Sequence, residues 1–388
     1  MLSSYNYKLM PEKESESTYL SALAKLAYPV NNILLYYAGL PYYSYNFSRD
    51  SILSAILMRE PLMLRDQLVF SALLQGTRKD PLSGEEPGKI FHQIPSVRQN
   101  RLSTEYNACD TTALFIIGHE AYLDMTNDYQ FIKKQRVYLE KAVDYILKHL
   151  MNNLFVEDPK FSDSKRFALK VTYWKDSQAP NRKHGLPIYP AVFTLAHVQN
   201  MKALRSAAKL LGFNDLETKA LEMKRHLTIL FDEKQGIFAS GVDQRGFFQG
   251  TSSDNLHMLY YLDESDIVKE KVKRILENSV NLETPLGYMT FNTDNASTDQ
   301  DITHHTNYHT NTVWPFEQAF IHQAALRFGL DTVASISERI YPYIKVEFPE
   351  LFHLENGRHY KKGCDIQLWT IAASIYFAKY FQSTNSSK

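Results

Sequence analysis

Three tryptophans share one feature, because each lies beside polar residues that are typical of loops. They are Trp174, in the stretch TYWKDS at 172–177, Trp314, in HTNTVWPFE at 309–317, and Trp369, in GCDIQLWT at 363–370. Tryptophan is mainly a core residue, so a single one would mean little. The C–H face of a sugar packs on a flat aromatic ring, while polar groups bond its hydroxyls. The three stretches therefore predict an aromatic rim that binds a sugar, with His309 and Gln367 among its polar groups.

Carboxylates near these tryptophans could cleave a glycosidic bond, which requires a proton donor and a second carboxyl that acts as base or nucleophile. Asp176 follows Trp174 by two positions, and apolar neighbours raise the pKa of a carboxyl toward the range of a proton donor. The second carboxyl is expected from the stretch VEFPELFHLE at 346–355, which contains Glu347, Glu350 and Glu355. Glu350 is favoured because it lies between a proline and two apolar residues.

Other polar residues stand at the expected starts of helices or in turns. Arg49 and Asp50 follow a run of aromatic residues in YSYNFSRDS, and Asp110 opens the apolar run in EYNACDTTALF. Each aspartate could cap a helix or contact a ligand. Lys89 follows a Pro-Gly turn in SGEEPGKIFHQ. These four residues are predicted to contribute to the same rim.

Three histidines, His304, His305 and His309, lie in the stretch 301–318. A metal site would need cysteine or acidic ligands at matching spacing, and none accompanies them. We therefore expect no metal, and we expect His309 to bond a ligand.

Helical periodicity runs through almost the whole chain. For example, YLEKAVDYILKHL at 138–150 repeats its apolar residues on one face. Short turns and long connections alternate between the expected helices, and long loops in a compact domain are usually functional. This alternation indicates helical hairpins in a closed ring with the long loops on one rim. The expected helices lie near 15–27, 49–59, 62–75, 109–125, 133–150, 188–211, 214–231, 252–262, 265–278, 313–328, 331–344 and 365–382.

Composition excludes several classes of protein. The 388 residues include 43 basic and 43 acidic ones, so electrostatics supports neither a nucleic-acid nor an anionic-membrane partner. The N-terminus has no signal-peptide pattern, and no apolar run is long enough to span a membrane. Two cysteines, Cys109 and Cys364, suit a reducing compartment. We expect a single cytoplasmic domain over residues 1–388, while the oligomeric state stays open.

Several stretches together resemble the catalytic domain of bacterial and archaeal glycogen-debranching-enzyme-like (amylo-α-1,6-glucosidase-like) glycoside hydrolases. These stretches, in family order from about residue 43 to 376, are FSRDS, EEPGKIFHQ, YNACDTTALF, TYWKDSQAPNRKHGLPIYPAVFTL, HTNTVWPFEQAFIHQAALRFG, FPELF and GCDIQLWTIAA. The resemblance implies an all-α (α/α)6 toroid. It also implies an inverting hydrolase that needs no cofactor, with a small carbohydrate such as a short α-glucoside as substrate.

The resemblance also assigns roles to individual residues. The aspartate of the Trp-x-Asp motif is the general acid of the family and falls on Asp176. The glutamate of the late motif is the base and falls on Glu350. Arg49, Asp50 and Asp110 match residues that line the sugar subsite.

The sequence departs from the family pattern at two places. Lys175 stands where an apolar residue is more common, and Tyr189-Pro190 replaces a segment that usually contains a glutamate. The chain also starts at the toroid, which favours a small substrate over branched glycogen. Two alternatives follow, an invertase-like sucrose hydrolase and a sugar-binding toroid without turnover.

Overall fold

The computed structural model describes residues 13–292 and 308–385. Its helices form an inner and an outer set. The inner helices are α2 (Ser48–Met58), α4 (Thr111–Thr126), α6 (Thr194–Leu211), α8 (Asp254–His257), α10 (Pro315–Arg327) and α13 (Leu368–Asn385). The outer helices are α1 (Lys13–Leu26), α3 (Pro61–Leu73), α5 (Tyr129–Lys148), α7 (Asn214–Leu227), α9 (Lys269–Ser279), α11 (Asp331–Glu338) and α12 (Tyr341–Ile344).

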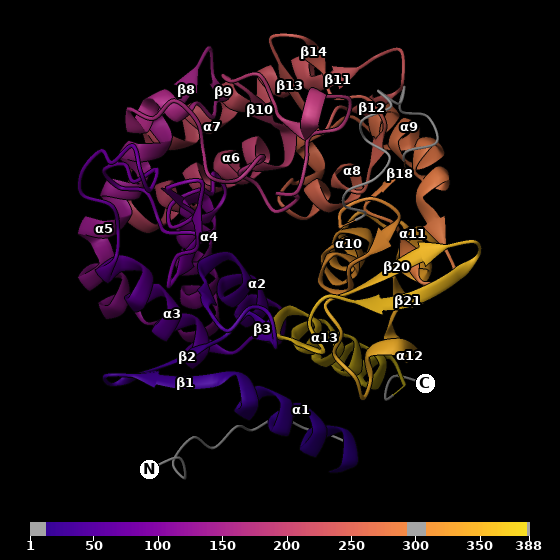
Figure 1. The fold of residues 1–388 in the computed structure, drawn as a ribbon. Coiled ribbons are helices and arrows are strands. Elements are labelled where there is room, and N and C mark those ends of the chain that lie inside the picture. The colour runs from indigo at the N-terminus through magenta and orange to yellow at the C-terminus, as the bar shows by residue number, and fades with distance from the viewer. Residues whose placement is uncertain (1–12, 293–307, 386–388) are drawn as a thin grey trace.

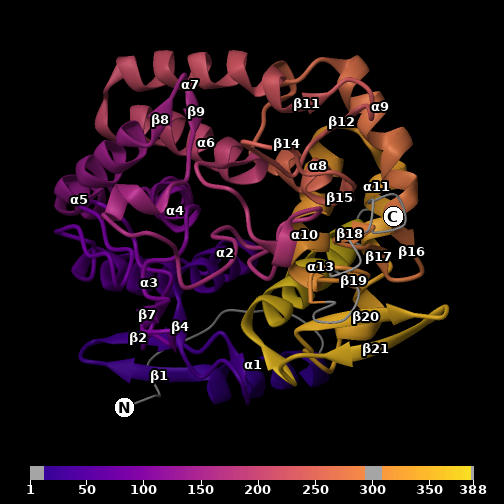
Figure 2. The same ribbon diagram turned by 45° about the horizontal axis from the view of Figure 1, so that its top comes forward.

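The inner helices contact one another in a closed circuit. Helix α2 packs on α4, α4 on α6, α6 on α8, α8 on α10, and α10 on α13, which returns to α2. Each outer helix after α1 contacts an inner helix beside it in the chain, as α3 contacts α2 and α11 contacts α10, whereas α1 contacts α13. Figure 1 shows the chain running once around this ring, with α13 beside α2 where the circuit closes. Figure 2 shows α1 alongside α13 in a second view.

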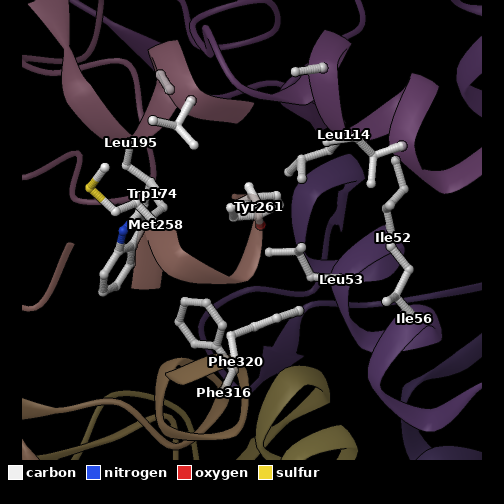
Figure 3. Close-up of a cluster of buried hydrophobic side chains, with 14 of the residues drawn as sticks. Ile52, Leu53, Ile56, Leu114, Trp174, Leu195, Met258, Tyr261, Phe316 and Phe320 are labelled. Carbon is white, nitrogen blue, oxygen red and sulfur yellow. The ribbon is translucent and has the colours of Figure 1, made fainter. Parts of the chain in front are cut away.

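The apolar patterns of the helices explain the two layers. Every residue of α2 is buried, and its sequence SRDSILSAILM has no continuous polar face. In contrast, α9 (KEKVKRILENS) buries only Val272, Ile275 and Ser279. A helix that is apolar on most sides belongs inside, whereas a helix with a single apolar stripe covers the outside. Side chains from α2, α4, α6 and α10 meet with Trp174 in the core cluster of Figure 3.

Short turns between paired helices have local causes. After α6, Gly212 adopts a left-handed conformation with φ 76°, which ends the helix before α7 begins at Asn214. Proline at the first position of α3 starts that helix, since it needs no intrahelical N–H bond there. In α5 the Asp128 side chain accepts the N–H of Phe131 and caps the first turn.

Short antiparallel strands connect the helices. The two-stranded pairs are β1 (Ala27–Val30) with β2 (Ile33–Tyr36), β3 (Gly39–Leu40) with β22 (Ile366–Gln367), β4 (Asn46–Phe47) with β5 (Gln93–Ile94), β6 (Arg98–Gln99) with β7 (Leu102–Ser103), β8 (Leu150–Met151) with β9 (Leu154–Phe155), β11 (Phe231–Asp232) with β12 (Ile237–Phe238), β15 (Thr251–Ser252) with β18 (Phe291–Asn292), and β16 (Glu283–Thr284) with β17 (Gly287–Tyr288). The three-stranded sheets are β10 (Val192–Phe193), β13 (Gly241–Asp243) and β14 (Gly246–Phe247), and β19 (Thr312–Val313), β20 (Leu351–Glu355) and β21 (Arg358–Lys362).

Several strands lead directly into inner helices. Strand β4 precedes α2, β10 precedes α6, β19 precedes α10, and β22 precedes α13. The register Ile366↔Leu40 and Gln367↔Gly39 ties the start of α13 to the loop before α2. These pairings hold the loops at the N-terminal ends of the inner helices, where the candidate site lies.

The helical fold expected from the sequence is confirmed, with local differences. The helix expected at 188–211 begins at Thr194, because strand β10 and its pairing with β13 occupy the residues before it. The helix expected at 331–344 is two helices, α11 and α12. The region 252–262 contains the short α8 followed by a 3-10 turn, Met258–Tyr260. Among the described residues, no helix is both long and apolar enough to cross a membrane.

Candidate active site

One pocket gathers all but two of the residues that the sequence predicted for the site. Its volume is about 70 Å³. Arg49 and Asp50 come from the first turn of α2, Trp314 directly precedes α10, and Trp369 lies in the first turn of α13. The lining residues are Ala38, Tyr43, Phe47, Arg49, Asp50, His92, Trp174, Asp176, Tyr308, His309, Trp314, Glu350, Gln367 and Trp369.

The three tryptophans form one connected aromatic wall. The ring centroids of Trp174 and Trp314 are 5.8 Å apart at 81°, and those of Trp314 and Trp369 are 5.3 Å apart at 78°. His309 stacks on Trp314 with centroids 5.0 Å apart. Edge-to-face packing of this kind stabilises the wall and fixes its shape. The rings therefore belong to the core and also line the pocket.

Four buried polar atoms of pocket residues have no hydrogen-bond partner among the described residues. They are Nε1 of Trp369, Oε1 of Gln367 and the two ring nitrogens of His92. The Gln367 oxygen lies close to Gly39, where a Cβ atom would approach it to 1.9 Å. Buried polar groups are normally paired, so a donor and an acceptor without partners in a pocket indicate a polar ligand.

Asp176 is half-buried in this pocket, and desolvation of its carboxyl raises the pKa to about 6 against the opposing effect of Arg49. Next to it, the Ser177 hydroxyl and Nδ1 of His309 are 2.9 Å apart, which joins the tryptophan–aspartate loop to the loop before α10. Burial, with the nearby cations Lys175 and Arg49, lowers the pKa of His309 well below its usual value. The imidazole is therefore neutral at physiological pH.

Glu350 is the only one of the three candidate glutamates that lines the pocket. Burial raises the pKa of its carboxyl to about 7. Its Oε1 accepts a hydrogen bond from the Tyr308 hydroxyl, and its Oε2 accepts the N–H of Cys364 at 2.9 Å. In contrast, Glu355 is exposed, and Glu347 is exposed and forms an ion pair with Lys361.

Arg49 and Asp110 form a buried bidentate pair at one side of the pocket. Arg49 Nε and Nη2 donate to the two Asp110 carboxylate oxygens, both at 2.9 Å. Burial opposes the charge of the guanidinium, but the Asp110 carboxylate raises the pKa of Arg49 above its usual value. Asp110 does not cap α4 and does not line the pocket. It therefore fixes the orientation of Arg49. Asp110 was expected to line the sugar subsite, but the structure connects it to the pocket only through Arg49.

Asp50 lies on the pocket wall and does not cap α2. Burial raises the pKa of its carboxyl to about 8, although Arg49 opposes this shift. Its Oδ1 is 3.5 Å from Nε2 of Gln367. At neutral pH this carboxyl is mostly protonated and can donate a hydrogen bond.

Lys89 is, with Asp110, one of the two predicted site residues that do not line the pocket. Its ammonium is fully buried, 3.1 Å from Glu86 and 3.9 Å from Glu157. His149 completes the cluster by contacting the other Glu86 oxygen at 2.8 Å. The Pro-Gly turn before Lys89 thus directs its side chain to an internal ion cluster, so the expected contact with a sugar has no support here.

Lys175 is also buried, and its ammonium lies over the Trp174 ring, 4.9 Å from the ring centroid. Its ammonium lies 3.0 Å from Asp254 and bonds the hydroxyls of Ser252 and Ser253. Asp254 in turn accepts the Trp174 indole N–H at 3.2 Å. The lysine that departs from the family pattern is therefore the counter-ion of the carboxylate that holds Trp174.

Sequence reasoning missed several lining residues, chiefly Tyr43, Phe47, His92 and Tyr308. The hydroxyls of Tyr43 and Tyr308 are 3.0 Å apart, and Tyr308 bridges to Glu350. The aromatic run before Arg49 was a usable signal for Tyr43 and Phe47. His304 and His305 lie outside the described residues. No group of three or more potential metal ligands occurs within residues 13–292 and 308–385.

Comparison with known proteins identifies the family and the type of fold. Residues 91–376 match the family model described as Amylo-alpha-1,6-glucosidase. No curated protein matches the chain significantly.

Solved structures extend this comparison. An uncharacterized conserved protein from Thermus thermophilus is similar over 95% of this chain and 100% of its own, with a TM-score of 0.68 and 11% identity. The GH63 mannosylglycerate hydrolase from the same organism, in complex with Tris and D-glycerate, is similar over 94% of this chain and 100% of its own, with a TM-score of 0.66 and 10% identity. A GH78 family rhamnosidase of Bacillus sp. GL1 is similar over 89% of this chain and 33% of its own, with a TM-score of 0.61 and 14% identity. At such identities the likeness concerns the fold alone.

Proposed function

The chain belongs to the amylo-alpha-1,6-glucosidase family of glycoside hydrolases, and we propose that it hydrolyses a short glycoside with inversion, using Asp176 as acid and Glu350 as base. One observation carries the proposal. Two carboxyls, the half-buried Asp176 and the buried Glu350, line one tryptophan-lined pocket, and desolvation raises their pKa values to about 6 and about 7. Carboxyls with pKa values near the working pH are the groups that acid–base catalysis requires.

In the proposed reaction Asp176 donates its proton to the glycosidic oxygen as the bond to the anomeric carbon breaks. Glu350 accepts a proton from the water that attacks this carbon from the opposite face. An inverting enzyme keeps its two carboxyls about 6.5–9.5 Å apart, which leaves room for that water. After release of the product, exchange with solvent returns a proton to Asp176 and removes one from Glu350.

The two pKa values have a direct consequence for this mechanism. Between about pH 6 and pH 7 the two carboxyls hold one proton between them. The reactive form is the one in which this proton lies on Asp176. A sugar that displaces the Tyr308 hydrogen bond to Glu350 changes the fraction of that form.

The pocket walls suggest how the sugar is held. Tryptophan rings pack on its C–H face, Arg49 donates to hydroxyl oxygens, and the protonated Asp50 donates a further hydrogen bond. The volume of about 70 Å³ holds only a few waters, so the pocket encloses only part of a hexose unless side chains at the wall move. The Tyr43–Tyr308 pair is the simplest group to move, since its contacts are hydrogen bonds between hydroxyls and to Glu350.

We also assign the ring to the (α/α)6 toroid type, in a single domain. The closed circuit of inner helices and the outer helix beside each of them support this assignment. Two buried free cysteines, Cys109 and Cys364, support a reducing compartment such as the cytoplasm. A short α-glucoside is the substrate that we expect first.

The test uses a panel of α-glucosides, sucrose, mannosylglycerate and short glycosides, with the released anomer followed by NMR. Asp176→Asn and Glu350→Gln should each lower kcat by roughly a hundred- to ten-thousand-fold. A glycosyl fluoride needs no protonation of its leaving group. Asp176→Asn should therefore retain activity on the fluoride, whereas Glu350→Gln should not.

Glu347→Gln is the matched control, because Glu347 lies three positions earlier in the same segment but is exposed and paired with Lys361. It should leave activity unchanged. Sugar binding without turnover on any substrate would exclude the hydrolase and favour a binding toroid. Retention of configuration would exclude the proposed roles of the two carboxyls.

A further inference from the structure

A second cavity, a groove of about 680 Å³, shares no lining residue with the pocket. It lies between the β6–β7 hairpin, the segment 158–170 and the segment 186–189. We call it the basic groove, after the four cations that line it. These are Lys160, Lys165, Arg166 and Lys170.

The four cations lack carboxylate partners. None of them forms an ion pair with any residue in the described part of the chain, although a neighbouring lysine, Lys79, pairs with Asp163 at 3.1 Å. Asp158 is the single acidic residue among those lining the groove, and its Oδ1 accepts the backbone N–H of Lys160 at 3.0 Å. The chain as a whole is neutral, so this groove concentrates uncompensated positive charge.

The groove also offers apolar and aromatic surface. Phe167 meets Tyr189 edge to face with ring centroids 5.2 Å apart, and Leu186 is 47% exposed. The Tyr189 hydroxyl donates to the backbone oxygen of Lys170 at 3.3 Å, which fixes the ring against the basic segment. Cations beside an exposed apolar wall fit a ligand that has both a C–H face and a negative charge.

The groove and the pocket are joined through one loop. Lys170 lines the groove, and the chain then passes through the buried residues Val171, Thr172 and Tyr173 to Trp174 and Asp176 in the pocket. The Cys109 N–H donates to Thr172 O at 2.8 Å and anchors this passage. The groove therefore adjoins, along the chain, the segment that carries the proposed acid.

We propose that the basic groove binds a saccharide through an anionic substituent, a carboxylate or a phosphate. That the ligand is a saccharide rests on the proposed function, whereas anion binding rests on the groove alone. Lys165 and Arg166 are adjacent, exposed and unpaired among the described residues, so they are the residues to change.

The test is calorimetric binding to the Asp176→Asn protein, which prevents turnover. The probes are glucose 6-phosphate, a glucuronate-containing disaccharide, the neutral counterpart of each, and inorganic phosphate. The variant is Lys165→Gln/Arg166→Gln. Its control is Lys133→Gln/Lys134→Gln, an adjacent exposed pair on α5.

The groove variant should weaken binding of an anionic sugar roughly two- to thirtyfold, the factor expected for two surface charge contacts. The control should have no effect, and added salt should weaken the wild-type interaction. Binding of glucose 6-phosphate but not of the glucuronate-containing disaccharide would identify a phosphate as the recognised group, and the reverse would identify a carboxylate. Thermal melts of both double variants show whether the fold is intact.

Equal affinity for neutral and anionic sugars, or equal loss in the control, would overturn the proposal. If inorganic phosphate binds as tightly as the sugar phosphate, the saccharide assignment is wrong. The proposed function fails separately, because it predicts turnover and depends on Asp176 and Glu350. If the protein shows no turnover but still binds an anionic sugar in the groove, the groove proposal stands and the proposed hydrolase function is wrong.

Discussion

Lys175 neutralises two buried carboxylates next to Trp174, and Lys175→Met removes the ammonium charge with little change in side-chain length. Its ammonium is 3.0 Å from Asp254 and 3.9 Å from Glu317, and all three side chains are at most 5% exposed. Methionine leaves both carboxylates in the core without their cation. Breaking a buried ion pair by removing one partner costs about 3–5 kcal/mol. We expect the free energy of unfolding to fall by that amount.

Urea unfolding measures this loss, with the slope of the transition checking that the unfolded states are comparable. Lys133→Met, at an exposed position of α5, is the control and should change stability by less than about 0.5 kcal/mol. The double variant Lys175→Met/Asp254→Asn removes a charge of each sign and should recover part of the loss. A loss below about 1 kcal/mol for Lys175→Met, or no recovery in the double variant, would refute the assignment of Lys175 as the counter-ion.

Three further predictions concern the charged groups of the pocket. Arg49→Met leaves Asp110 buried without its bidentate partner, so the unfolding free energy measured by denaturation should drop by about 3–5 kcal/mol. Sugar affinity measured by calorimetry should also fall. Unchanged stability would contradict the pairing of Arg49 with Asp110. For Asp50, the folded-state pKa of about 8 exceeds the ordinary 3.8, so the folded state binds the extra proton and stability falls as pH rises between these values. Asp50→Asn should remove this decline. Between pH 4 and pH 8 the unfolding free energy of the variant should rise relative to that of the wild type by up to about 5 kcal/mol, at about 1.4 kcal/mol per pKa unit. Parallel pH–stability curves for the two proteins would contradict the raised pKa of Asp50. The pH profile of kcat/KM should be bell-shaped with limbs near pH 6 and pH 7, because only the form in which the pair Asp176 and Glu350 holds a single proton reacts. A profile that is flat from pH 5 to pH 8 would exclude this pair of carboxyls as acid and base.

The positions of the helices could be predicted because hydrophobic periodicity is a local property. Helices α5 and α7 carry a clear apolar stripe, and both lie where the periodicity indicated. The start of α6 was misplaced, since the pairing of β10 with β13 depends on residues about fifty positions away in the chain. Short strands of two residues carry too little pattern to be recognised from sequence.

Part of the site could also be predicted, because loop-bound tryptophans and nearby carboxyls are visible in the sequence. Trp174, Trp314 and Trp369 line one pocket with Asp176 and Glu350, as their residue types suggested. The sequence favoured Glu350 among three candidate glutamates, from its apolar neighbours and from the family motif. Burial and the N–H of Cys364 distinguish Glu350 in the structure.

The sequence by itself determined the helical pattern, the tryptophan-rich loops and the family motifs, since each depends on residues that are near one another in the chain. Only the tertiary structure decided which charges meet. It paired Arg49 with Asp110, 61 positions away, and directed Lys89 and Lys175 inward. A buried charge requires a partner whose position depends on the packing of distant helices, and that packing has no local signature in the sequence.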